Sequence, residues 1–324
     1  MIQRLSPQHI VIGVDLGGTN LRIAGVTREG RVVTFRHEKT RADGGPEALL
    51  TRILEGLSDV EEKLRDDGWE ILGVSLGVPG VVSRREGVVE SSPNLPGWQK
   101  VPLLERLHER IEMPLLLEND ANAAVFGEYW AGAGRGKETV VLMTLGTGVG
   151  GGIIIDGRLL RGAEGMAGEI GHLTVEPEGE PCLCGNRGCL ESYASARGIC
   201  ARYARLAGEG GEEDEEGSSG AAGVFARASR GDERARQAFS EAGTYLGIAM
   251  AAIVNIINPE AIIVGGGVLP AWDFFMPAAK KEMLERAFQA PAERVELLPA
   301  ALGDRAGCIG AAGLLWKEQA SSSL

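Results

Sequence analysis

The chain has 324 residues, enough for two domains of ordinary size, and its 44% hydrophobic and 24% charged residues are typical of a soluble globular protein. Its net charge of −12 argues against a nucleic-acid backbone as the main partner, and the N-terminus lacks the apolar run of a signal peptide. No apolar stretch approaches the ~20 residues of a membrane-spanning helix, and three of the five cysteines lie within eight residues, unlike a secreted disulfide framework, so we expect a cytoplasmic enzyme or sensor without a membrane partner.

The first part of the chain predicts one α/β unit. Residues 10–15, 20–26 and 31–35 predict three strands joined by tight turns. Helical periodicity over residues 46–66 is followed by an apolar strand at 71–76, a helix near 101–111 and a strand at 115–117.

The second part opens in the same way. It predicts strands at 139–144 and 152–155 around a glycine turn, helices at 190–206 and 233–257, a strand at 261–264, one more helix, a strand at 295–298 and a final helix at about 306–317. Residues 208–223 are acidic and rich in glycine and serine, which predicts a solvated loop. Because both parts begin with strand, glycine turn and strand, we expect an internal duplication.

Two familiar nucleotide motifs fail on inspection. Residues 132–138 nearly match a P-loop, but Ala131 replaces its first glycine and Glu138 replaces its magnesium-binding Ser or Thr. Residues 146–151 match GxGxxG, but the isoleucines at 153–155 predict a strand where that fingerprint requires a helix. The dinucleotide interpretation is therefore weak.

The two predicted glycine hairpins offer a better phosphate site. Leu16-Gly17-Gly18-Thr19 and Leu145-Gly146-Thr147-Gly148 each expose backbone N–H groups and add a Thr hydroxyl. Asp15 precedes the first turn, where a carboxylate suits Mg²⁺ held through water. Together with Gly265-Gly266-Gly267 after a later strand, these turns predict a clamp on a nucleotide.

A cluster of cysteines predicts a metal site. His172, Cys182, Cys184 and Cys189 supply one imidazole and three thiols, a complete tetrahedral set for zinc. The Cys-x-Cys step is shorter than the usual Cys-x-x-Cys, so free cysteines and a redox pair remain alternatives. A fully ligated zinc leaves no position for a substrate water, so the metal should be structural.

The segment Leu117-Glu118-Asn119-Asp120 stands between a predicted strand and a predicted helix. Helix capping is the simplest explanation for Asn and Asp at this position. A carboxylate at the carboxyl end of a strand also points to where open α/β sheets bind their ligands. The residues alone leave both interpretations open.

Five segments in order resemble the motifs of ROK-family sugar kinases: DLGGTNLR (15–22), LENDANAA (117–124), LGTGVGGGIIIDG (145–157), GEIGH (168–172) and CLCGNRGCLE (182–191). The resemblance implies an α/β, two-domain actin/hexokinase-like ATPase fold, a ribonuclease H-like duplication with ATP in the interdomain cleft. It implies a small domain at 1–118, a large domain at 119–303 with a zinc loop at 172–189, and a final helix at about 304–320 that packs back on the first domain.

The resemblance also assigns roles to residues. It implies that Asp120 is the catalytic base and that the zinc ligands are those named above. The implied sugar-binding residues are Asn94, Asn119, Asp120, Glu169, His172 and Glu191. We expect ATP with Mg²⁺ at Asp15, Gly17, Gly18, Thr19, Asn20, Thr147, Gly148, Gly266 and Gly267.

The expected reaction transfers a phosphoryl group from ATP to D-glucose and yields glucose 6-phosphate, because the segment SPNLPGW (92–98) resembles the glucokinase branch of the family. Alternative substrates are N-acetylmannosamine, N-acetylglucosamine and fructose. A sugar-sensing ROK repressor is a further alternative, but its DNA-binding domain has no room before the first strand, and the charge is wrong for DNA. The resemblance also implies a homo-oligomer, either a dimer or a tetramer.

Overall fold

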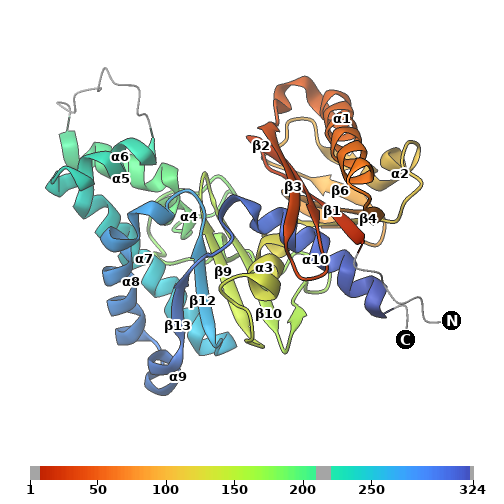
Figure 1. Ribbon diagram of the computed structural model, residues 1–324. Coiled ribbons are helices and arrows are strands. Elements are labelled where there is room, and N and C mark those ends of the chain that lie inside the picture. Colours follow the sequence, from red (N-terminus) through yellow and green to blue (C-terminus); the bar gives the residue numbers. More distant parts are fainter. Residues whose placement is uncertain (1–7, 209–219, 322–324) are drawn as a thin grey trace.

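The computed structural model describes residues 8–208 and 220–321, which form two α/β lobes. Figure 1 shows the small lobe in red and orange and the large lobe in green and blue. Two helices, α3 (Asp120–Ala131) and α10 (Ala306–Ser321), lie between the lobes. The functional residues discussed below are carried by strand ends and turns of both lobes.

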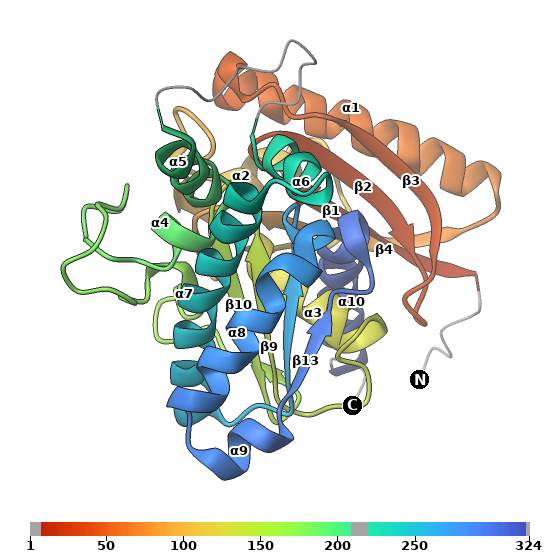
Figure 2. The same ribbon diagram turned by 90° about the vertical axis from the view of Figure 1, so that its left-hand side faces the viewer.

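The small lobe is built on a five-stranded sheet with the strand order β3-β2-β1-β4-β8. Its strands are β1 (His9–Leu16), β2 (Asn20–Val26), β3 (Val32–Lys39), β4 (Glu70–Val78) and β8 (Leu115–Asn119). Helix α1 (Gly45–Asp66) covers the outer face of this sheet (Figure 2). A second, three-stranded sheet and the short helix α2 (Leu103–His108) complete the lobe; its strands are β5 (Val81–Ser83), β6 (Val88–Ser91) and β7 (Gln99–Val101).

The large lobe repeats this topology. Its five-stranded sheet has the order β11-β10-β9-β12-β13, with β9 (Val140–Leu145), β10 (Val149–Ile155), β11 (Arg158–Leu159), β12 (Ala261–Gly265) and β13 (Glu296–Pro299). In each sheet the first three strands pair antiparallel and the last two join in parallel. The predicted duplication and the α/β ATPase-like fold class are confirmed.

Helices cover the outer face of the large sheet: α4 (Glu191–Ala194), α5 (Ala196–Ala207), α6 (Ala221–Ser229), α7 (Glu233–Ile257), α8 (Trp272–Arg286) and α9 (Gln289–Arg294). Among the described helices, α7 alone is long and apolar enough to cross a membrane, and half of its apolar window is buried inside the protein. The expectation that the sequence holds no such stretch is therefore wrong. Helix α7 is apolar because it packs against the large-lobe core and lies beside α8 (Figure 2).

Helices α3 and α10 share a third hydrophobic core with the inner faces of both sheets. Their backbones approach closely, because a Cβ atom on Gly310 would lie only 1.6 Å from the Ala123 carbonyl oxygen. A Cβ atom on Gly127 would lie 2.3 Å from the Ala306 carbonyl oxygen. The close contact packs α3, which begins at Asp120, directly against the C-terminal helix α10.

Several predicted boundaries are wrong. Residues 190–206 do not form one helix, because Ser195 has an extended backbone (φ −74°, ψ 162°) and its side chain caps α5 by accepting a hydrogen bond from Gly198 N. Residues 209–219 of the predicted acidic loop lie outside the described residues, and residues 221–223 begin helix α6 instead of continuing the loop. The three-stranded sheet and α9 were not predicted, since their strands and helix have only three to six residues.

Candidate active site

The junction of β8 and α3 places Asn119 and Asp120 side by side. Asn119 is the N-cap of α3: its Oδ1 accepts from Ala121 N (2.9 Å) and Asn122 N (3.1 Å), and its Nδ2 donates to the Gly80 carbonyl (3.1 Å). Helix capping therefore occupies the side-chain oxygen of Asn119. Asp120 is the first residue of α3 and is half-buried.

The electrostatic surroundings of Asp120 suit a proton acceptor. Burial, reinforced by the Asp15 and Glu169 carboxylates and opposed by the Ala121 N–H, raises the pKa of Asp120 to about 7. A general base works best when its pKa lies near the working pH. Asp15 of the predicted nucleotide site lies close to this base, because Asp15 pairs with Gly77 and a Cβ atom on Gly77 would lie 3.5 Å from the Asp120 Cα atom.

Asp15 is the penultimate residue of β1 and pairs with Arg22, whose Nη1 lies 3.2 Å from Asp15 Oδ2. Burial raises the pKa of Asp15, and the Arg22 guanidinium opposes this rise. The start of α10 closes over Asp15, because a Cβ atom on Gly307 would lie 2.5 Å from the Asp15 carboxyl carbon. Asp15 is thus held in one position at the end of the strand.

The two glycine turns are β-hairpins, as the sequence predicts. Gly17 N donates to Asn20 O in the β1–β2 hairpin, and Gly146 N donates to Gly148 O in the β9–β10 hairpin, both at 2.9 Å. Strand β10 follows the second turn, so the dinucleotide interpretation of residues 146–151 is excluded. Thr19 and Thr147 are exposed at the two tips.

The remaining predicted nucleotide residues lie around these turns. The Asn20 side-chain oxygen accepts from His37 Nε2 (3.1 Å) and Lys39 Nζ (3.2 Å). Gly266 has φ +91° and packs so closely on the end of β9 that a Cβ atom would lie 2.4 Å from Leu145 O. Gly266 and Gly267 are exposed, and they follow β12 beside the second hairpin.

The predicted sugar residues lie beside the phosphate turns. Glu191 Oε2 accepts from Val149 N (3.1 Å), and a Cβ atom on Gly148 would lie 2.4 Å from that same oxygen. Arg197 Nη2 lies 3.4 Å from Glu191 Oε1. The backbone of the second hairpin and the Arg197 guanidinium therefore hold the Glu191 carboxylate in place.

Asn94 and Glu169 are more exposed. The Asn94 backbone lies against the first hairpin, since a Cβ atom on Gly18 would be 3.0 Å from Asn94 O. The Glu169 side chain is 62% exposed, and its Oε2 lies 3.9 Å from His172 Nε2. Asn94 and Glu169 thus approach the predicted sugar-binding residues from different lobes.

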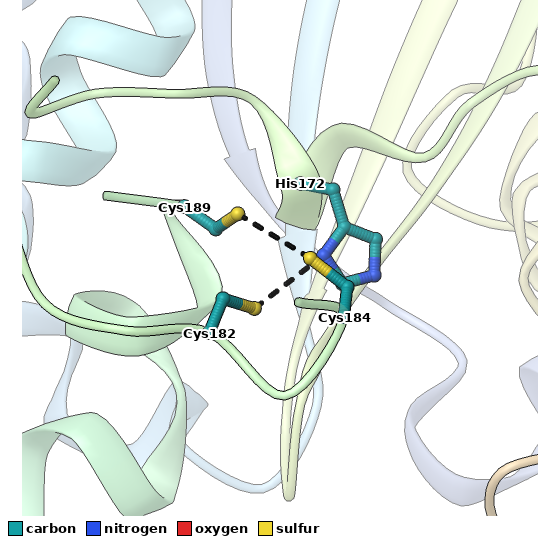
Figure 3. A group of neighbouring side chains, drawn as sticks. All are labelled: His172, Cys182, Cys184 and Cys189. Carbon is teal, nitrogen blue, oxygen red and sulfur yellow. Dashed lines mark hydrogen bonds between the residues drawn. The ribbon is translucent and has the colours of Figure 1, made fainter. Parts of the chain in front are cut away.

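The structure brings the four predicted metal ligands together (Figure 3). Their ligand atoms all lie within 4.8 Å of one another; Cys182 Sγ is 3.8 Å from His172 Nδ1, and Cys184 Sγ is 3.7 Å from Cys189 Sγ. Ligands on a tetrahedral zinc ion are expected to be about 3.5–3.8 Å apart. The cluster therefore fits one tetrahedral cation, and His172 turns its other ring nitrogen towards Glu169.

Two buried acids had no predicted role. Glu118, 3% exposed, accepts from Arg161 and from Asn122, and Glu128, fully buried, accepts from three backbone N–H groups. Sequence reasoning missed both because an acid in a helical or strand segment usually lies in solvent. The apolar residues around Glu128 were the only available signal of its burial.

The whole chain is similar in sequence and structure to known proteins. The sequence profile of the ROK family matches residues 11–318. A glucokinase of Halalkalibacterium halodurans is 39% identical over 322 residues, which are 96% of this chain and 96% of the relative. The crystal structure of a ROK family glucokinase from Streptomyces griseus in complex with glucose and AMPPNP has 33% identity and a TM-score of 0.80, covering 94% of this chain and 98% of that one. A xylose repressor of Caldicellulosiruptor bescii is 32% identical over 92% of this chain and 77% of the repressor.

Proposed function

Because the chain belongs to the ROK family, we propose that it is an ATP-dependent kinase that converts D-glucose to glucose 6-phosphate. The observation that carries the proposal is the position of Asp120 beside the nucleotide side: Asp15 pairs with Gly77 between β1 and β4, and a Cβ atom on Gly77 would lie 3.5 Å from the Asp120 Cα atom. The relatives named glucokinase support ATP as donor and glucose as acceptor.

The residues divide the work of phosphoryl transfer. The N–H groups of the two hairpins receive the phosphates of ATP, and Asp15 is the residue we expect to hold the accompanying Mg²⁺, which neutralises phosphate charge when bound. The sugar O6 attacks the γ-phosphorus as its proton passes to an Asp120 oxygen, and the bond from the γ-phosphorus to the bridging oxygen of ADP breaks. Asp120 then returns the proton to solvent.

Glucose specificity follows from a polar wall. Glu169, His172 and Glu191 are placed to bind sugar hydroxyls, with Asn94 at the rim. A site built around a hydroxyl discriminates strongly, because a substrate that lacks this group leaves buried polar atoms unpaired. N-acetylmannosamine, N-acetylglucosamine and fructose remain the alternative acceptors.

We further propose a structural Zn²⁺ at His172, Cys182, Cys184 and Cys189. Leu190 N donates to Leu173 O (2.9 Å), so the two chain segments that carry these ligands are already paired beside the cluster. When bound, the ion would hold the His172 ring and the turn before Glu191 in register. The four side chains would fill all four coordination positions of the ion, so the metal would have no position open for a catalytic water.

The proposal includes a cytoplasmic enzyme, where ATP and reduced thiols are available. It also includes a homo-oligomer, which remains to be measured by light scattering. Neither property enters the chemistry of the site.

The test is ADP release measured across a panel of hexoses and acetylated amino sugars. We expect rapid release with glucose. A sugar-sensing regulator would bind a sugar without releasing ADP, so saturable sugar binding with no sugar-dependent ADP release would refute the kinase proposal.

A further inference from the structure

A buried carboxylate immediately precedes the capping residue of α3. Glu118 Oε1 accepts from Asn119 N (3.2 Å) and from Asn122 Nδ2 (3.0 Å), so it is bound to the first turn of that helix. Its Oε2 accepts from Arg161 Nε at 2.8 Å, and Arg84 Nε lies 4.0 Å away. Only 3% of Glu118 is exposed. Both of its oxygens are thus occupied by protein groups.

Arg161 comes from the large lobe, at the start of the segment that leads from β11 to Glu169. Ala167 N donates to Arg161 O (3.0 Å), which folds this segment into a compact loop. The loop reaches the small lobe, where a Cβ atom on Gly165 would lie 3.1 Å from Val82 O. The guanidinium therefore ties the loop that ends at Glu169 to the strand that ends beside Asp120.

The ion pair lies on the side of β8 and the Arg161 loop away from the predicted sugar and nucleotide residues. It borders a cavity of about 550 Å³ that is lined by Arg84, Leu117, Arg161, Glu164 and Glu318 among others, and none of the predicted sugar or nucleotide residues lines it. Stability alone does not call for an ion pair here, because apolar side chains of similar volume would stabilise a buried site at least as well. A role in positioning neighbouring residues explains the Glu118–Arg161 ion pair better.

We propose that Glu118 and Arg161 are positioning residues, whose ion pair sets the separation of Asp120 from Glu169. The base and the sugar-binding carboxylate reach the substrate from different lobes, and the pair fixes one against the other. This inference rests on the proposed kinase function and adds to it the residues that hold the two halves of the sugar site together.

The experiment compares Glu118→Gln, Arg161→Gln and the double variant in steady-state assays with glucose and ATP. Misplacement of a reacting group by about 1 Å costs on the order of 10²-fold in rate, so we expect kcat/KM for glucose to fall about 10²-fold in each single variant. The KM for ATP should stay at the wild-type value. The double variant should lose no more than either single variant, because the pair acts as one unit.

Two further measurements separate positioning from other effects. The pH midpoint of kcat/KM should stay nearly unchanged in Glu118→Gln, since burial and the Asp15 carboxylate, the two largest causes of the raised pKa of Asp120, do not depend on the ion pair. Arg161→Lys, which keeps the charge, should recover part of the lost activity. The matched control is Arg158→Gln, an exposed arginine three residues earlier on β11, which should behave as the wild type.

Several results would overturn the inference: wild-type kcat/KM in both single variants, additive losses in the double variant, or equal rises in the KM for glucose and for ATP. If Glu118→Gln does not fold, the two Arg161 variants decide, because the Arg161 side chain is 30% exposed. A wild-type protein that phosphorylates no hexose would refute the proposed function and this inference with it. An active wild type with unaffected variants would refute the inference alone.

Discussion

Replacement of Asp120 by Asn removes the proposed proton acceptor and changes little else, because Asn has the same shape and its oxygen can still accept from Ala121 N. General-base assistance is worth about 10²–10⁴-fold in rate, and we expect kcat to fall by about that factor. The Kd for glucose, measured by calorimetry, should stay close to the wild-type value. Asp273→Asn, an exposed acid at the start of α8, is the control and should be fully active.

The pKa of Asp120 sets a pH profile for the wild type. With a pKa of about 7, the ionised fraction is near nine-tenths at pH 8 and near one-tenth at pH 6, so kcat/KM should fall about tenfold between these values. The stability of the fold should respond with the opposite sign. The folded pKa lies above the unfolded value of 3.8, so native stability declines as pH rises from about 4 to about 7 and is constant above.

Asp120→Asn removes this penalty and should therefore raise Tm relative to the wild type at pH 8. The difference should shrink at pH 5 and vanish near pH 4, as measured by thermal unfolding. Near-native kcat in Asp120→Asn would show that another group accepts the proton. A flat wild-type profile between pH 6 and pH 8 would refute the electrostatic argument.

The other predictions concern the metal, the turn and a buried acid. Purified protein should contain about one zinc per chain, and Cys184→Ser should lower both zinc content and Tm while Cys200→Ser should not; no zinc in the wild type would contradict the assignment. Gly148→Ala places a Cβ atom 2.4 Å from Glu191 Oε2, so the KM for glucose should rise about tenfold or more, and an unchanged KM would separate that carboxylate from the sugar. Glu128→Ala leaves three backbone N–H groups unpaired and should cost about 3 kcal/mol or more in urea unfolding, whereas a loss below about 1 kcal/mol would mean that water replaces the carboxylate.

Local sequence patterns were sufficient to predict the main strands, the two hairpins and the cluster of candidate metal ligands. The glycine turns at 17–18 and 146–148 predicted both hairpins, and the repeated strand–turn–strand opening predicted the duplication that the two sheets show. The four candidate metal ligands could be recognised because His172 and the cysteines lie within one short stretch of chain. In each case the residues that determine the feature are neighbours in sequence.

Features that depend on distant contacts were not predictable. The amide of Asn119, a predicted sugar-binding residue, donates to the carbonyl of Gly80 in the turn after β4, a contact between residues 39 positions apart. Glu118 is buried because Arg161 reaches it from the other lobe. The apolar length of α7 was missed because charged residues in its first turns lower the local hydropathy, although half of its apolar window is buried in the core.

The most direct test of the whole account is a competition assay, with glucose and N-acetylmannosamine present together, labelled ATP as donor and the sugar phosphates separated and identified. The two sugars differ at C2, where an equatorial hydroxyl is replaced by an axial acetamido group. A pocket closed around the hydroxyl should favour glucose in kcat/KM by at least ~10³, with glucose 6-phosphate as the product and one ADP formed per sugar phosphate. Equal use of the two sugars, or preference for the acetylated one, would contradict the assignment of glucose, and the absence of any sugar phosphate would contradict the kinase itself.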